Sequence, residues 1–127
     1  MKNSRIFLLI TAASGMLAVA LGAFGAHAFK ALLIQNQRLD TYELAVRYHF
    51  YHTLALLGIS LLLNKQGHKP LILSAGSMII GTTLFSGSLY VLALFNTSSV
   101  AMLTPLGGTF LLTGWGLLFY SVLKSRT

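Results

Sequence analysis

Four long apolar stretches, separated by short polar ones, divide the chain. They cover residues 6–29, 44–63, 71–95 and 102–123. A helix rises about 1.5 Å per residue and the hydrocarbon core of a bilayer is about 30 Å thick, so each stretch is long enough to cross a membrane. We predict spans at about 6–29, 41–63, 71–95 and 104–123. The pattern therefore predicts an all-α integral membrane protein with a single transmembrane domain, residues 1–127.

The connections between the stretches are short, which makes sequential helices antiparallel and predicts a four-helix up-down bundle. The longer connection, residues 30–40, is expected to form a short interfacial helix or turn. Thr104 and Pro105 are interpreted as an N-cap hydroxyl followed by a proline at the first helical position. Only 9% of the 127 residues are charged, and the spans leave no room for a catalytic domain outside the bilayer.

The basic residues predict which way the chain crosses the membrane. The ends that share one side carry six of them: Lys2, Arg5, Lys65, Lys69, Lys124 and Arg126. The first loop on the other side has Lys30 and Arg38 close to Asp40 and Glu43. Cytoplasmic segments carry the excess of Lys and Arg, so both termini are predicted to be cytoplasmic. No nucleic-acid partner is expected, because the charge of +7 is spread over the span ends.

Small residues recur at helical spacing and predict close contacts between helices. Lipid tails are as apolar as leucine, so helices in a bilayer associate through close packing and hydrogen bonds, which small residues permit. The predicted packing positions are Gly15, Gly22, Gly25, Gly87, Gly107 and Gly108. The chain has no cysteine, which excludes disulfides and thiolate metal sites.

The second span contains the densest group of ionisable residues. The candidate functional residues there are Glu43, Arg47, His49 and His52. At about 100° per residue the two charged side chains share one face, and the two histidines lie roughly opposite. Glu43 and Arg47 stand four residues apart in the favourable order, which predicts a local ion pair. The alternative is an entry site for a cation or a proton.

Counting along the helix makes His52 the deepest titratable group. If Leu63 marks the cytoplasmic boundary, His52 lies about 16 Å inward and His49 about 21 Å inward. Thr82 or Thr83 and Trp115 reach a similar level, which predicts a polar layer. In one interpretation His52 is a neutral imidazole bonded to a hydroxyl or carbonyl of a neighbouring helix. In the other it relays protons or binds a ligand.

A metal or haem site is a weaker hypothesis. His49 and His52 are three residues apart, and His27 at the outer end of span one is the third candidate ligand, but no carboxylate shares the histidine face. We therefore expect no metal and no cofactor. A Ser/His/Asp arrangement is not predicted either, since Asp40 and Glu43 lie on the wrong face of the same helix.

Four strings of the sequence are distinctive: LGAFGAHAFK at 21–30, TYELAVRYHFYHTLALL at 41–57, FSGSLY at 85–90 and TPLGGTFLLTGW at 104–115. They resemble the uncharacterised family of small inner-membrane proteins that includes bacterial YgdD and YwdK. The resemblance covers nearly the whole chain and implies a four-span plasma-membrane protein without an established activity. Its recurrent polar positions would here be Gly25, His27, Tyr42, Tyr48, His49, His52, Ser86, Gly87, Pro105 and Gly108.

Three classes of function remain open. The expected function is that of a non-enzymatic membrane component, an accessory or assembly protein embedded in the lipid bilayer. Its expected partner is a second copy of the chain or another membrane protein. The first alternative is a small proton or ion transporter or channel subunit that uses the polar cluster of span two. The second is a haem- or metal-binding redox protein. Candidate supporting residues are His27, Tyr48, Thr83, Ser86 and Trp115.

Overall fold

The computed structural model describes residues 2–125, nearly all of them helical. Four helices are long: α1 (Lys2–Ala26), α3 (Leu39–Lys65), α4 (Lys69–Phe95) and α5 (Leu103–Lys124). Two short elements connect them, α2 (Lys30–Gln35) and the 3₁₀ helix η1 (Ser98–Met102). The described part of the chain contains no strand. The prediction of an all-α protein is confirmed.

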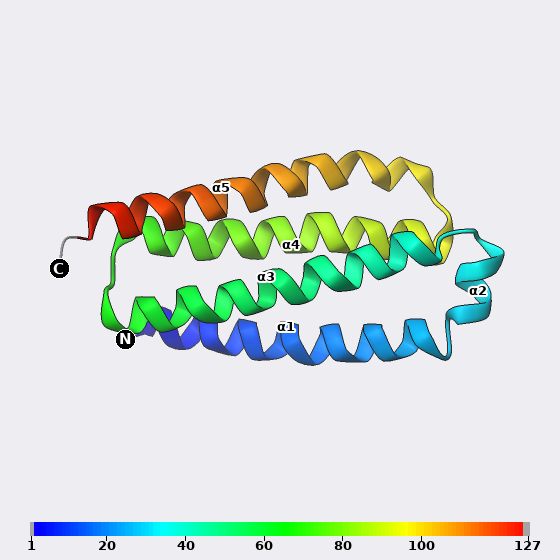
Figure 1. The fold of residues 1–127 in the computed structure, drawn as a ribbon, viewed down its shortest axis with the longest axis horizontal. Helices are drawn as coiled ribbons and strands as arrows, with labels where there is room; N and C mark the ends of the chain where they lie inside the picture. The colour runs from blue at the N-terminus through cyan, green and yellow to red at the C-terminus, as the bar shows by residue number, and fades with distance from the viewer. Residues whose placement is uncertain (1, 126–127) are drawn as a thin grey trace.

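The four long helices lie side by side and alternate in direction (Figure 1). Both ends of the chain and the α3–α4 connection lie at one end of the molecule, and α2 and η1 lie at the other. Extensive contacts join α1 to α3, α3 to α4 and α4 to α5, but not α1 to α5. The contacts therefore form an open series and do not confirm the predicted four-helix bundle.

The α1–α3 contact depends on glycines of α1. A Cβ atom at Gly22 would lie 3.4 Å from Val46 Cγ1, and one at Gly25 would lie 2.7 Å from Cδ1 of the Tyr42 ring. The Tyr42 hydroxyl donates a hydrogen bond to the Leu21 carbonyl oxygen. Because Gly25 has no side chain, the Tyr42 ring lies directly on the backbone of α1.

The α4–α5 contact also depends on a glycine, but only some of the glycines predicted as packing positions lie in it. A Cβ atom at Gly107 would lie 2.8 Å from Phe85 Cα, whereas one at Gly108 would lie 3.9 Å from the Phe85 ring. A Cβ atom at Gly87 would meet nothing within 4 Å. The packing role predicted for Gly87 is therefore wrong within this chain, because no neighbouring helix approaches that position.

The start of α5 differs from the prediction. The helix begins at Leu103, with Met102 before it, so Thr104 is not the N-cap and Pro105 is not the first residue. The reason is that η1 runs directly into α5, and the chain is already helical before Thr104. The Thr104 hydroxyl instead lies 2.6 Å from Ser88 Oγ and joins α5 to α4.

The first loop, where we expected a short interfacial helix or turn, contains the helix α2, which packs against the end of α4. Leu33 is fully buried in a cluster with Tyr42 and Ala93. The Asn36 side-chain amide donates to the carbonyl oxygens of Ala93 at 3.0 Å and Leu94 at 3.3 Å. These bonds satisfy carbonyl groups that the last turn of α4 leaves without helical partners.

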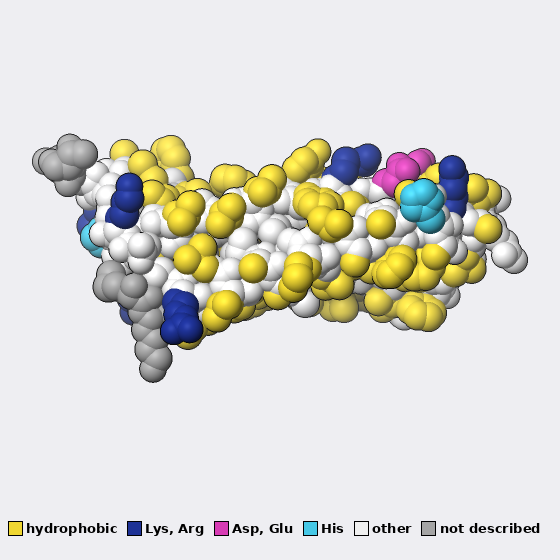
Figure 2. Space-filling view, turned by 90° about the horizontal axis from the view of Figure 1, so that it is seen from below, with side chains coloured by type: hydrophobic (Ala, Val, Ile, Leu, Met, Phe, Trp, Pro, Cys, Tyr) yellow, Lys and Arg dark blue, Asp and Glu magenta, His cyan; other side chains and the backbone are white. Residues whose placement is uncertain are grey.

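Three segments are long and apolar enough to cross a membrane: Asn3–Ala26, Lys69–Phe95 and Ser98–Lys124. The predicted span 41–63 falls within α3, which does not meet this criterion. The first half of α3 is too polar, because it holds Asp40, Glu43, Arg47 and two histidines. Figure 2 shows charged side chains gathered toward the two ends of the molecule, with hydrophobic side chains between them.

Candidate functional site

His52 is buried on α3, and both of its ring nitrogens are hydrogen-bonded. Nδ1 lies 2.8 Å from the carbonyl oxygen of Tyr48, and the indole N–H of Trp115 donates to Nε2 at 3.1 Å. A carbonyl only accepts and an indole N–H only donates. Nδ1 therefore carries the proton and Nε2 does not, which makes His52 a neutral imidazole. A protonated ring would turn an N–H toward the N–H of Trp115.

His49, about one turn earlier, connects three helices. Its Nε2 lies 3.0 Å from Ser14 Oγ on α1, and its Nδ1 lies 2.9 Å from the Tyr90 hydroxyl on α4. Ser14 Oγ is also 2.7 Å from Thr53 Oγ1. Hydroxyl groups both donate and accept, so the chain Thr53–Ser14–His49–Tyr90 has two consistent directions of hydrogen bonding.

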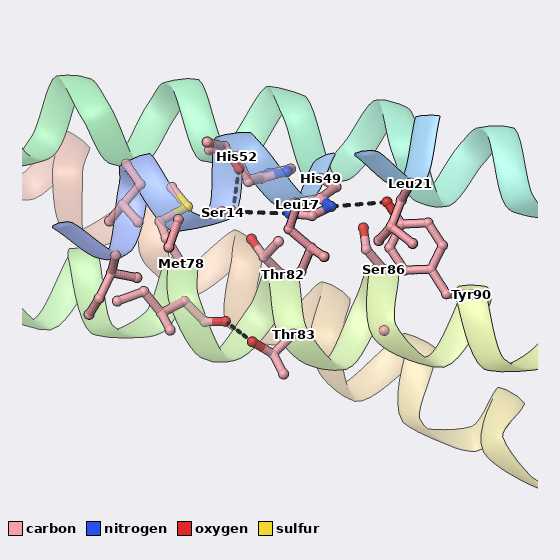
Figure 3. A pocket seen from close by; sticks show the side chains of 16 residues that line it. Ser14, Leu17, Leu21, His49, His52, Met78, Thr82, Thr83, Ser86 and Tyr90 are labelled. Carbon is pink, nitrogen blue, oxygen red and sulfur yellow. Dashed lines mark hydrogen bonds between the residues drawn. The ribbon is translucent and has the colours of Figure 1, made fainter. Parts of the chain in front are cut away.

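These side chains border a hollow between α1, α3 and α4, here called the α1–α4 hollow (Figure 3). Its volume is about 400 Å³, within the range of about 300–1,000 Å³ that is usual for small-molecule sites. The three helices contribute side chains such as Leu17 and Leu21, His49 and Thr53, and Thr82 and Ser86. No Lys, Arg, Asp or Glu lines it.

Glu43 and Arg47 lie elsewhere. Both are exposed and line a second hollow, together with Lys30, Gly25 and other residues that do not border the first one. Neither side chain forms an ion pair within residues 2–125. The predicted Glu43–Arg47 ion pair is therefore wrong, since exposed long side chains gain little from being held in one geometry. The structure does not bring this pair together with the two histidines.

Two of the supporting residues join α3 to α4. The Tyr48 ring stacks on the Phe85 ring with 4.6 Å between centroids. The Ser86 hydroxyl donates to the Ala45 carbonyl oxygen at 2.8 Å. Both residues therefore belong to the contact between α3 and α4.

The remaining candidates do not meet at one place. Thr83 is exposed and donates to the Ile79 carbonyl within α4. His27 is exposed in the turn after α1, whereas His49 and His52 are buried within α3. Within residues 2–125, no three His, Asp or Glu side chains come close enough to hold a metal ion. The third ligand of the metal hypothesis is thus distant from the other two.

Sequence reasoning missed Ser14 and Tyr90, whose hydroxyl groups bond to His49, and Thr53, which bonds to Ser14. Ser14 lies next to a packing glycine, Thr53 is adjacent to His52, and Tyr90 ends the string FSGSLY. A hydroxyl on another helix at the depth of a buried imidazole is the signal that could have identified Ser14 and Tyr90. Which of several such hydroxyls faces the ring depends on the rotation of each helix, and the sequence does not show it.

Comparison with known proteins gives a family but no activity. Residues 21–108 match the family described as "Protein of unknown function (DUF423)". The UPF0382 membrane protein of Haemophilus influenzae is 39% identical over 127 residues, which cover 100% of this chain and 99% of that protein. YwdK of Bacillus subtilis is 36% identical over 94% of this chain and 98% of its own length.

The UPF0382 inner membrane protein YgdD of Escherichia coli K12 is 36% identical over 98% of this chain and 94% of its own length. No solved structure matches the chain. The family model covers most of the chain, and full-length relatives exceed one third identity. The predicted resemblance is confirmed, and the chain belongs to the DUF423 (UPF0382) family of membrane proteins of unknown function.

Proposed function

We propose that the protein is a non-enzymatic accessory component of the plasma membrane that works through contacts with a second copy or another membrane protein. The observation that carries this proposal is the use of both buried histidines inside the chain. All four ring nitrogens of His49 and His52 have partners, which lie on α1, α3, α4 and α5. A general acid or base, or a ligand of a metal ion, needs a nitrogen that faces its substrate or metal. Here three of the four nitrogens hold α3 to other helices, and the fourth is bonded to the Tyr48 carbonyl oxygen within α3.

The transport alternative needs Glu43, Arg47, His49 and His52 on one continuous path. The first two side chains line one hollow and the last two line another, and the two hollows share no lining residue. An exchange of protons through His52 would also break its bond to Trp115, because a proton on Nε2 would face the indole N–H and not an acceptor. The geometry therefore favours the accessory function over transport.

The faces available for a partner are those that no other helix covers. On α1, Leu9, Met16 and Val19 are each more than half exposed, and on α5 so are Leu112 and Phe119. In a bilayer such faces contact either lipid or another protein. A contact with another protein differs from a contact with lipid in that helices pack closely.

Cross-linking in membranes tests the accessory function. The chain has no cysteine, so single cysteines at Met16 and Leu112 report on each face separately, with Ala75→Cys as the buried control. A bifunctional thiol- and amine-reactive reagent is expected to give one discrete adduct of defined mass from at least one face and none from the control. Mass spectrometry would identify the attached chain. A monomer at both positions, together with monomeric protein in lipid nanodiscs, would contradict the proposal.

We also infer that all four long helices span the membrane, with both termini in the cytoplasm. α3 has 27 residues, about 40 Å of helix, and its contacts place it between α1 and α4. Its two buried histidines form hydrogen bonds to other helices, which supports a span of low overall hydropathy. The end of the molecule that holds the start of α1, the end of α5 and the α3–α4 connection (Figure 1) also holds Lys2, Arg5, Lys65, Lys69 and Lys124. By the positive-inside rule this supports a cytoplasmic location for that end.

Reporter fusions made in Escherichia coli test this orientation. Green fluorescent protein fused after Thr127 is expected to fluoresce, and alkaline phosphatase at the same point is expected to be inactive, because it needs disulfides that form outside the cytoplasm. Alkaline phosphatase fused after Thr97 is expected to be active. The opposite pattern, or active phosphatase at both points, would contradict the proposed topology.

A further inference from the structure

One hydroxyl group faces the α1–α4 hollow without a hydrogen bond to the protein. Thr82 lines the hollow and forms no bond there, whereas the next residue, Thr83, donates to the Ile79 carbonyl at 2.8 Å. Among the described residues every fully buried side-chain nitrogen or oxygen has a partner. Figure 3 shows Thr82 on α4 near Leu17 and His49. In hydrocarbon, where water is scarce, an unpaired hydroxyl is costly.

The position of Thr82 limits what its partner can be. The residue is the central one of α4, which runs from Lys69 to Phe95, so a spanning α4 places it near the bilayer midplane. α1 and α4 border the hollow from two sides and share no extensive contact, so the gap between them opens toward lipid. A phosphate headgroup does not reach this depth, because moving a charge to the bilayer centre is too costly.

The remaining lining indicates an apolar ligand. Ile10, Leu17 and Leu21 border the hollow from α1, and Leu56 and Met78 border it from α3 and α4. No charged residue contributes, and the hydrogen bonds of His52 fix it as neutral. On α4, a Cβ atom at Gly87 would meet nothing within 4 Å, so this residue leaves space open.

We propose that the α1–α4 hollow binds an uncharged membrane lipid, whose apolar chain lies along Leu17 and Leu21 and whose carbonyl oxygen accepts a hydrogen bond from the Thr82 hydroxyl. Diacylglycerols and prenyl quinones share this chemistry, an apolar chain with an uncharged carbonyl. The inference goes beyond the accessory function and does not rest on it.

Photolabelling of the full chain in phosphatidylcholine vesicles tests the proposal. The probe is a diacylglycerol with a photoactivatable diazirine in one acyl chain, and mass spectrometry locates the labelled residues. Labelling is expected at residues that line the hollow, with little from a phosphatidylcholine probe of the same chain. Excess dioleoylglycerol or a prenyl quinone is expected to suppress it, and the stronger competitor identifies the source. Equal labelling by both probes, labelling that neither competitor suppresses, or no labelling of the hollow would overturn the proposal.

Two variants and a matched control locate the site. Gly87→Leu fills the hollow and is expected to lower its labelling at least fivefold, and Thr82→Val is expected to weaken labelling about twofold to tenfold through loss of one hydrogen bond. The control is Gly76→Leu. Gly76 lies on the same helix, and a Cβ atom there would also meet nothing within 4 Å, but the residue does not line the hollow. Labelling of this variant is therefore expected to equal that of the wild type. Unfolding curves confirm that each variant is folded. Equal labelling of Gly87→Leu and wild type would overturn the proposal, while the cysteine cross-links described above would be unaffected.

Discussion

Replacing Gly107 with alanine is expected to lower the free energy of unfolding by about 1–3 kcal/mol or more, the usual cost of overpacking. The added Cβ atom would lie 2.8 Å from Phe85 Cα and 2.9 Å from the Leu84 carbonyl carbon. Both atoms belong to the backbone of α4, so relief requires the two helices to move apart. Denaturant titration in mixed micelles, followed by the fluorescence of the single tryptophan, measures the change.

The neighbouring glycine provides the control. A Cβ atom at Gly108 would approach only the Phe85 ring, at 3.9 Å, an ordinary contact distance. Gly108→Ala is therefore expected to change the unfolding free energy by less than about 0.5 kcal/mol. Equal destabilisation by the two substitutions would mean that α5 is rotated relative to α4 in a way that this structure does not describe.

Replacing His49 with alanine is the second substitution with a large expected effect, a loss of about 2–4 kcal/mol. The change removes hydrogen bonds to α1 and to α4, each worth about 0.6 kcal/mol on average in a membrane protein. It also removes a buried side chain and leaves a cavity, which usually costs more than the bonds themselves. The same unfolding titration provides the measurement.

Two further substitutions separate these contributions. Tyr90→Phe removes one bond and keeps the ring, so it is expected to cost about 0.6 kcal/mol. Tyr51→Ala truncates an exposed side chain of the same helix and is expected to cost less than either. The His49 account fails if His49→Ala destabilises the protein no more than Tyr51→Ala does.

The existence of the helices and the relative level of residues along them could be read from the sequence, because both depend on the length and hydropathy of one segment at a time. The rise per residue alone places His52 and Trp115 at a similar level, and the structure joins them by a hydrogen bond. The α2 helix could be predicted from its local sequence as well, because its apolar residues lie next to the polar residues of a loop.

Contacts between helices could not be read from the sequence, because they depend on how each helix is rotated. Gly87 and Gly107 both looked like packing positions, yet only Gly107 faces a neighbouring backbone. Glu43 and Arg47 have the spacing of an ion pair, but both remain exposed and unpaired in the described structure. The hydroxyl groups that bond His49 come from two other helices and leave no local pattern.

The most direct test of the account is the protonation state of His52, because its neutral, fully bonded ring is what supports a structural role. Nitrogen NMR of protein labelled with ¹⁵N-histidine in lipid bilayers at pH 7 measures it, with His52→Gln assigning the signal among the four histidines of the chain. A structural role of His52 predicts a protonated Nδ1 and an unprotonated Nε2 whose shift changes in Trp115→Phe. An imidazolium, or a proton on Nε2, would contradict it.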